Sequence, residues 1–223
     1  MAISRSVDQK RVSVSEAQRA RVAGEGCARH SYLQRVVEAA GPHAGRDLAD
    51  AVHLLCNLHG RYPGLIELAL QRCPAGPTQS WLDQAAAAFE EERHYLVRLT
   101  AAVGPMPSTP GAAETEASML AARHALETLA TSERNGCALG AATALVGDWQ
   151  PIRHLLDRAA GRAGLDRPRC TLPDEASLTG IIESTSAGPA SDRALAFGGE
   201  QLLLQHRALF DLLEARAEAR GDF

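Results

Sequence analysis

Two histidines and two glutamates fall where helices normally carry apolar residues. His59, Glu92, Glu133 and His206 each lie on the apolar stripe of a separate segment with helical spacing. Ionisable side chains are normally kept off such stripes, because an unpaired charge in a core is costly. Two carboxylates and two imidazoles that converge from four helices form a ligand set suited to iron, manganese or zinc. The pattern therefore predicts a metal site in the core of a helical bundle.

A second pair of residues offers a different metal site. Glu91 and His94 are spaced as Glu-x-x-His, which makes a carboxylate and an imidazole neighbours on one helix face. Helical di-metal proteins use this pair as ligands. When Glu92 faces the core, His94 falls on a flank of the same helix, so the two ligand sets require different helix rotations. At most one of the two sets binds a metal.

The four residues of the first ligand set also fit ordinary structural roles. His59 precedes a Gly-Pro break, where a histidine complements the C-terminal dipole of a helix. Glu92 belongs to a charged run that suits a solvated face, and Glu133 is followed by an arginine with which it can form an ion pair. His206 fits a core histidine with satisfied hydrogen bonds. A structural interpretation of these residues therefore stays open beside the metal site.

Segments with helical periodicity must position these residues, and clusters of proline and glycine separate the segments. The expected helices are residues 46–59 with a continuation at 65–73, 78–103, 113–146, 148–161, 174–182 and 191–220. Pro63 predicts a kink or a restart within the first of them. Gly136 and Gly140 are unusual in a helix interior, and they favour close packing of a neighbouring helix over the wall of a ligand site.

The composition favours helices throughout the chain. The 223 residues include 41 Ala and 28 Leu but only ten Val and five Ile, so helix formers dominate over sheet formers. We predict an all-α protein with a four-helix-bundle core, ferritin-like or haem-oxygenase-like, and additional helices. Residues 1–28 are expected to form a mobile N-terminal tail. Residues 29–220 are expected to form a single bundle domain, with a Gly-, Pro- and Ser-rich loop region near 161–190.

Charge and hydropathy exclude several classes of function. The net charge is −4 and no basic cluster occurs, which argues against nucleic-acid binding. No stretch reaches the roughly 18 apolar residues of a membrane span, and the N-terminus lacks the apolar region of a secretory signal. Lys10 is the only lysine, which excludes Schiff-base and P-loop chemistry. We therefore expect a cytoplasmic protein that binds neither nucleic acid nor membrane. Whether it is an enzyme, and which residues would be catalytic, stays open.

Four short segments resemble a known family. They are HGRYPG at 59–64, PSTPG at 107–111, RHALE at 123–127 and GCALGA at 136–141. They are similar to a family of uncharacterised helical proteins from alphaproteobacteria, over roughly residues 45–165. This resemblance implies a helical fold and assigns no site. More distantly, the helix lengths and the Glu91/His94 pair are similar to ferritin-like bundles, which implies a bundle that holds metal.

Two hypotheses about function follow. The first is a metal-binding helical bundle with a redox or metal-handling role, with the metal ligands His59, Glu92, Glu133 and His206, or alternatively Glu91 and His94. The second is a non-enzymatic interaction or dimerisation module, in which the buried polar residues are structural. Its partner would be a second copy of the chain, in a homodimer, or another protein. The long Ala-rich helices and the absence of a complete catalytic motif motivate the second hypothesis.

Overall fold

Helices form all of the regular structure in the computed structural model, which describes residues 12–222. The elements are α1 (Val14–Glu25), the short 3-10 helix η1 (Cys27–Arg29), α2 (Ser31–Glu38), α3 (Ala44–His59), α4 (Leu65–Arg72), α5 (Pro77–Ala102), α6 (Ala112–Ala130), α7 (Cys137–Gly147), α8 (Trp149–Ala163), α9 (Glu175–Thr185) and α10 (Pro189–Ala219). The prediction of an all-α protein is confirmed. None of these helices combines the length and the apolar character that a membrane crossing needs.

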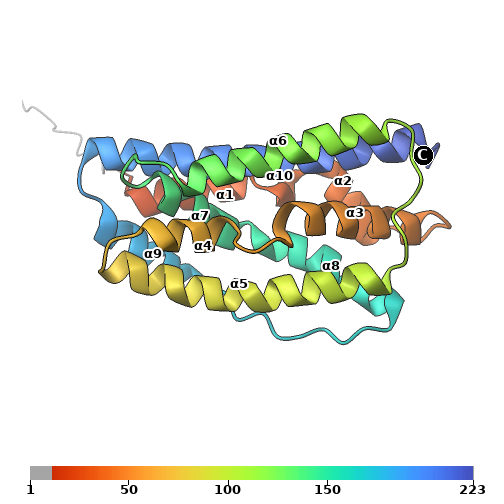
Figure 1. Ribbon diagram of the computed structural model, residues 1–223, viewed down its shortest axis with the longest axis horizontal. Coiled ribbons are helices and arrows are strands. Elements are labelled where there is room, and N and C mark those ends of the chain that lie inside the picture. Colours follow the sequence, from red (N-terminus) through yellow and green to blue (C-terminus); the bar gives the residue numbers. More distant parts are fainter. Residues whose placement is uncertain (1–11, 223) are drawn as a thin grey trace, which may run out of the picture.

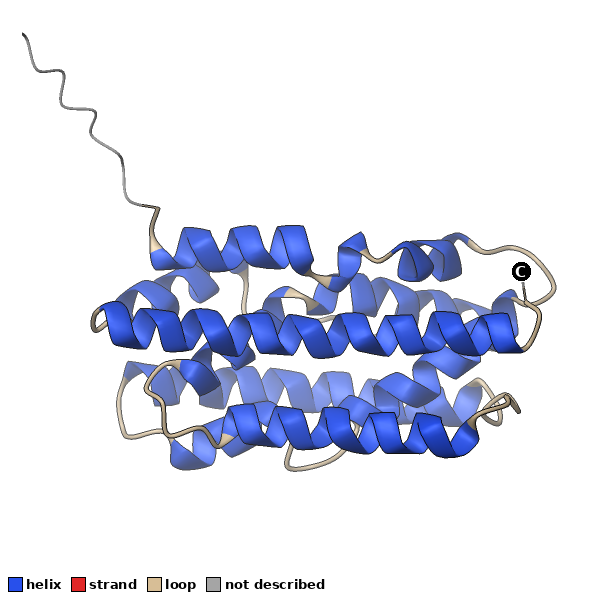
Figure 2. Ribbon diagram, turned by 90° about the horizontal axis from the view of Figure 1, so that it is seen from above, coloured by secondary structure: helices blue, strands red, loops and turns tan. Residues whose placement is uncertain are grey.

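The three longest helices run along the long axis of the molecule. α6 lies beside α10, and α5 runs along the opposite side, with α3 and α4 between them (Figure 1). α8 packs against both α3 and α5. Seen from above, α1 follows the grey trace, and η1 and α2 continue along the same side of the bundle (Figure 2). Buried apolar side chains from Cys27 to Ala217 form one continuous core.

Three of the helical runs are interrupted, and a cysteine, histidine or aspartate side chain is buried at each interruption. α1 gives way to η1 at Gly26, directly before Cys27. α3 ends at His59, and α4 begins after Pro63, so the predicted break at this proline is confirmed. α7 passes into α8 through Asp148 alone. Cys27, His59 and Asp148 are 0%, 5% and 1% exposed, so each interruption lies next to a side chain that is buried in the core.

The backbones of α7 and α10 touch each other without intervening side chains. A Cβ atom added to Gly140 would lie 2.0 Å from the carbonyl oxygen of Leu195, and one added to Gly198 would lie 2.0 Å from that of Cys137. At Gly136 the added atom would lie 2.6 Å from the carbonyl oxygen of a residue in the first turn of α10. The prediction that Gly136 and Gly140 serve close helix packing is therefore confirmed.

A buried ion-pair network joins the C-terminal end of α10 to α3. Asp50 is fully buried and pairs with Arg216 at 2.7 Å and with Arg220 at 2.5 Å. Arg220 also pairs with Asp47 at 2.9 Å and with Asp222 at 2.7 Å. Arg220 contacts three carboxylates and Arg216 contacts that of Asp50, so each charge in the network has an oppositely charged partner, which buried charges require.

The predicted single helix over residues 113–146 is wrong. α6 ends at Ala130 and α7 begins at Cys137. Gly136 adopts a φ of +97°, a left-handed conformation that glycine accepts readily and that ends any continuous helix. Glu133 therefore lies exposed in the loop between the two helices rather than on a buried stripe.

The N-terminal boundary also differs from the prediction of a tail over residues 1–28. From Val14 the chain forms α1, because Ser13 and Glu16 build a capping box at its start. Gln18 is buried on this helix and donates a hydrogen bond of 3.0 Å to the carbonyl oxygen of Gly140. The residues before position 12 lie outside the described part of the chain.

The remaining helix predictions are confirmed to within a few residues. α5, α8 and α10 cover the ranges expected from the periodicity. Within the region near 161–190, the side chain of Asp174 caps α9 by accepting from the backbone N–H of Ser177. The irregular part of this region is therefore reduced to a segment before α9 and a short turn after it.

Candidate functional site

The two histidines that the sequence singles out face each other in the core. Nε2 of His59 lies 3.1 Å from Nε2 of His206, and the two rings are nearly perpendicular, with an interplanar angle of 87°. The other ring nitrogen of His206, Nδ1, lies 2.8 Å from Oδ2 of Asp148. His206 is fully buried. The three residues form a carboxylate–imidazole–imidazole chain enclosed by protein, which we call the His–His–Asp chain.

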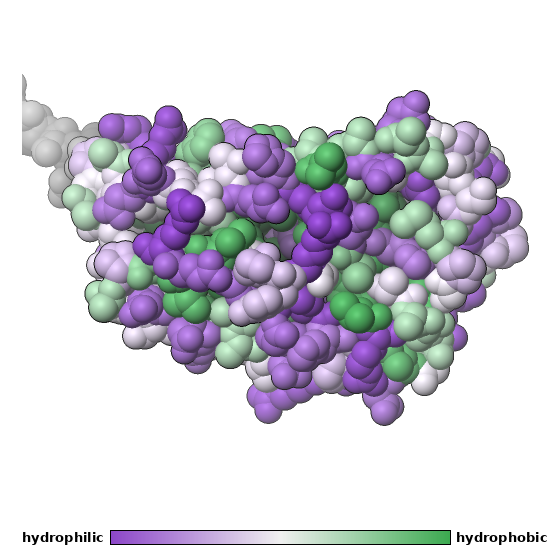
Figure 3. All heavy atoms as spheres, viewed as in Figure 1, coloured by the Kyte–Doolittle hydropathy of each residue, from purple (hydrophilic) through white to green (hydrophobic). Residues whose placement is uncertain are grey.

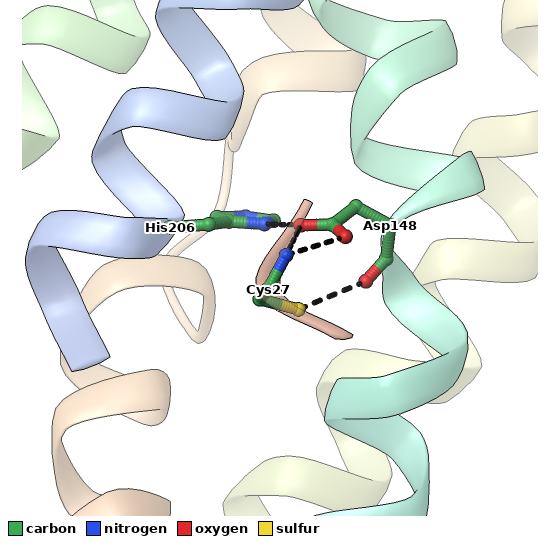
Figure 4. Close-up of side chains that lie close together, drawn as sticks. All are labelled: Cys27, Asp148 and His206. Carbon is green, nitrogen blue, oxygen red and sulfur yellow. Dashed lines mark hydrogen bonds and ion pairs between the residues drawn. The ribbon is translucent and has the colours of Figure 1, made fainter. Parts of the chain in front are cut away.

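The backbone at Cys27 holds Asp148 from its other side (Figure 4). The N–H of Cys27 donates to Oδ1 of Asp148 at 2.9 Å, and its thiol lies 3.5 Å from the carbonyl oxygen of the same residue. Burial, and then the negative charge of Asp148, raise the pKa of the Cys27 thiol. The thiol therefore keeps its proton and donates a weak hydrogen bond, which makes Cys27 a support for Asp148 and a poor nucleophile.

Hydrogen bonding determines the roles of the ring nitrogens. An ionised carboxylate only accepts, so Nδ1 of His206 donates to Asp148. One proton then lies between the facing Nε2 atoms of His206 and His59. Burial, followed by electrostatic interaction with His206 and with Arg93, lowers the pKa of His59 well below its usual value. His59 is therefore neutral at pH 7, which is the form of imidazole that binds metal ions.

Glu92 is buried close to the His–His–Asp chain, but both of its oxygens are occupied. Oε2 accepts from the indole Nε1 of Trp149 at 2.9 Å, and Oε1 pairs with Arg153 at 2.7 Å. The Trp149 ring meets the His59 ring edge-on, with 5.4 Å between centroids. Glu92 thus neutralises Arg153 and orients the tryptophan that packs against His59.

The other predicted ligands lie at the surface. Glu133 is in the exposed loop between α6 and α7. Glu91 is exposed on α5, and the side chain of His94 is 63% exposed, with Nε2 at 3.1 Å from Glu90. The structure therefore brings together His59 and His206, and places Glu92 beside them. It leaves Glu133, Glu91 and His94 outside the His–His–Asp chain.

Two residues of the site, Asp148 and Cys27, do not stand out in the sequence. Asp148 occupies the N-cap position of α8, but its side chain makes no capping hydrogen bond there. The position of Asp148 between an apolar run and Trp149 is the feature of the sequence that indicates burial of its carboxylate. No sequence pattern connects Cys27 to residues more than a hundred positions away. Cys27, Asp148 and His206 nevertheless offer ligand atoms that all lie within 4.8 Å of one another.

The contact between η1 and Asp148 leads to a stability prediction for Gly26. In Gly26→Ala, the new Cβ would lie 2.4 Å from Oδ1 of Asp148 and 2.4 Å from the carbonyl oxygen of Val22. We expect the free energy of unfolding, measured by urea denaturation, to fall by about 2 kcal/mol. The matched control is Gly24→Ala on the same helix, where nothing lies within 4 Å of the added atom. Equal stability of the two variants would contradict the placement of Asp148 against Gly26.

The protein thus has an all-α fold that encloses a buried carboxylate–imidazole–imidazole chain. The protein is a member of a family of unknown function, DUF6975, whose family model matches residues 22–221. This range includes Cys27, His59, Asp148 and His206. No curated protein and no solved structure matches the chain.

Proposed function

We propose that the protein binds one iron, manganese or zinc ion in its core, through the Nε2 atoms of His59 and His206. The observation that carries this proposal is the 3.1 Å separation of two buried imidazole nitrogens that point at each other. Two nitrogens at 2.0–2.1 Å from a tetrahedral ion lie about 3.3 Å apart, so the observed spacing suits a pair of metal ligands. The remaining coordination positions would be filled by small ligands such as water.

The surroundings of the two rings support the same proposal. Metal-binding histidines usually donate their second N–H to a carboxylate, which orients the ring and increases its basicity. Asp148 accepts this hydrogen bond from Nδ1 of His206 at 2.8 Å. The lowered pKa of His59 keeps its ring neutral at neutral pH, so a metal ion has to displace only the one proton that the two Nε2 atoms share. The protonated thiol of Cys27 favours the Nε2 pair over the group formed by Cys27, Asp148 and His206, because thiolate ligation requires loss of that proton.

The proposal includes a four-helix core of the ferritin-like or haem-oxygenase-like kind, with additional helices around it. His59 comes from α3, Glu92 from α5, Asp148 from the junction of α7 and α8, and His206 from α10. Convergence of polar residues from facing helices is how helical bundles build metal sites. Imidazole ligands suit a transition metal, and iron or manganese would supply redox chemistry at this place.

Metal analysis of the purified protein tests the proposal. The protein is incubated separately with zinc, with manganese and, under anaerobic conditions, with ferrous iron, and free metal is then removed. We expect about one equivalent of at least one metal in the wild-type protein, and loss of that metal in His59→Gln and His206→Gln. The matched control is His94→Gln, which changes an exposed histidine on α5 and is expected to bind normally.

Three results would each contradict the proposal. The first is less than about 0.2 equivalents of all three metals in the wild-type protein. The second is full metal binding by His59→Gln. The third is loss of metal in Cys27→Ser together with retention in His59→Gln, which would assign the metal to the group of Cys27, Asp148 and His206. Circular dichroism verifies that each variant is folded, so that loss of metal is not confused with loss of structure.

A metal-free wild-type protein would favour the second hypothesis, an interaction or dimerisation module with structural polar residues. Exposed apolar side chains support the hypothesis of an interaction module, and they include Val97 on α5, Leu120 on α6 and Phe197 on α10. The face in Figure 3 carries hydrophobic residues in small groups scattered among hydrophilic ones. Larger continuous patches are typical of interaction surfaces, so we favour the metal site.

A further inference from the structure

A cavity of about 500 Å³ opens beside the His–His–Asp chain. It lies between α1, the junction of α7 and α8, the segment that precedes α9, and α9 itself. This volume is in the range of small-molecule binding sites. Asp148 is part of its lining, so the cavity reaches the same residue that binds Nδ1 of His206.

The cavity wall is mainly apolar. Val22 from α1, Val146 from α7, Leu172 from the segment before α9, and Leu178 and Ile182 from α9 contribute to it. These side chains come from four different parts of the chain, so they enclose a bound molecule from several sides. Apolar walls of this kind favour a ligand with a hydrocarbon body, because burial of apolar surface supplies most of the binding free energy.

The charged groups of the lining disfavour an anion. Arg19 is the one base among the lining residues, and it pairs with Glu175 at 2.8 Å. Both of these side chains are more than half exposed, at 58% and 68%, so they lie at the solvent side. Asp148 and Asp174 add two further acids to the lining. A carboxylate ligand would therefore meet excess negative charge, whereas a neutral or cationic group would not.

We propose that this cavity binds a small, largely apolar molecule that carries no negative charge, with its inner end next to Asp148. The proposal concerns a second site and does not depend on a metal at His59 and His206. A bound molecule would contact Asp148, which orients His206, so the ligand would lie next to the His–His–Asp chain.

A residue in the cavity wall provides a variant that fills the space. Gly147 is the last residue of α7 and lines the cavity. A Cβ added there would meet a methyl group of Val22 at 3.6 Å and Cδ1 of Leu178 at 3.9 Å, which are ordinary contacts. A Cβ therefore fits at this position, and the rest of the side chain in Gly147→Leu would occupy space that the cavity otherwise offers to a ligand. Gly180→Leu on α9 is the matched control, because nothing lies within 4 Å of an added atom there.

Calorimetric titration of the full chain at pH 7 with three eight-carbon probes tests the proposal. The probes are 1-octanol, which is neutral, octylamine, which is cationic, and octanoate, which is anionic at this pH. We expect octanol and octylamine to bind, and octanoate to bind about tenfold more weakly or not at all. Gly147→Leu is expected to lose binding of all three probes, and Gly180→Leu is expected to keep it.

The opposite results would overturn the proposal. These are no binding of any probe to the wild-type protein, octanoate binding as tightly as octanol, or unchanged binding by Gly147→Leu. Leu178→Trp fills the same space from the opposite wall, and it replaces Gly147→Leu if that variant does not fold. The metal content of the same samples is measured separately, so a failure of this site is distinguishable from a failure of the metal site.

Discussion

Replacing Gly140 with alanine is expected to lower the free energy of unfolding by about 3 kcal/mol or more. The added Cβ would lie 2.0 Å from the carbonyl oxygen of Leu195 and within 2.8 Å of its Cα. All of the atoms it meets are backbone atoms, so no side-chain rotation can relieve the contact. α7 and α10 would have to separate, and the apolar contacts along both helices would weaken.

The size of this effect is measured by urea denaturation of Gly140→Ala next to a control of opposite expected sign. Gly180 lies in α9, and nothing is within 4 Å of an added Cβ. Gly180→Ala is therefore expected to stabilise the protein by up to about 1 kcal/mol, because alanine is the better helix former. If Gly140→Ala proved as stable as Gly180→Ala, the close approach of α7 and α10 would be wrong.

Removal of the carboxylate at position 50 is expected to destabilise the fold by about 3–5 kcal/mol. Asp50 is fully buried and is the acid that pairs with Arg216, at 2.7 Å. In Asp50→Ala, Arg216 would keep only neutral acceptors, such as the Thr115 hydroxyl at 3.1 Å. Arg220 would retain two other acids, so most of the loss arises from one uncompensated buried guanidinium group.

Two further variants separate charge from shape in this network. Asp50→Asn keeps the size of the side chain and loses its charge, so we expect a smaller loss than for alanine. Asp211→Ala, also an acid-to-alanine change, removes an acid that is 72% exposed and pairs with His30 at 2.9 Å. Exposed pairs contribute little, so the expected change is less than about 1 kcal/mol. Equal effects of Asp50→Ala and Asp211→Ala in urea denaturation would contradict a buried role for Asp50.

The sequence predicts the parts of the structure that depend on local periodicity. His59 and His206 stand out because each interrupts an apolar stripe, and the structure places both in the core. Glu92 stands out in the same way and is also buried. The packing role of Gly136 and Gly140 is interpreted correctly, because both glycines lie against the backbone of α10, although Gly136 precedes α7 instead of lying within a helix.

The parts that fail depend on backbone conformation or on distant contacts. Glu133 is assigned to a buried stripe because periodicity alone does not reveal that α6 ends at Ala130, nor the left-handed conformation of Gly136 at the start of α7. The partnership of Asp148 with Cys27 and His206 joins residues 121 and 58 positions apart, respectively. Such pairing follows from the packing of whole helices, which one sequence does not specify.

The position of α10 at the end of the fold has a consequence for biosynthesis. The ribosome produces a chain from its N-terminus, and helices near that end begin to associate first. His206 and Arg216 both lie on α10, the last helix of the described chain. Until α10 has emerged, Asp148 and Asp50 lack the partners that make their burial favourable, and the backbone surface of α7 is uncovered. Neither buried polar network can therefore be completed before α10 has emerged, although their other residues lie much earlier in the chain.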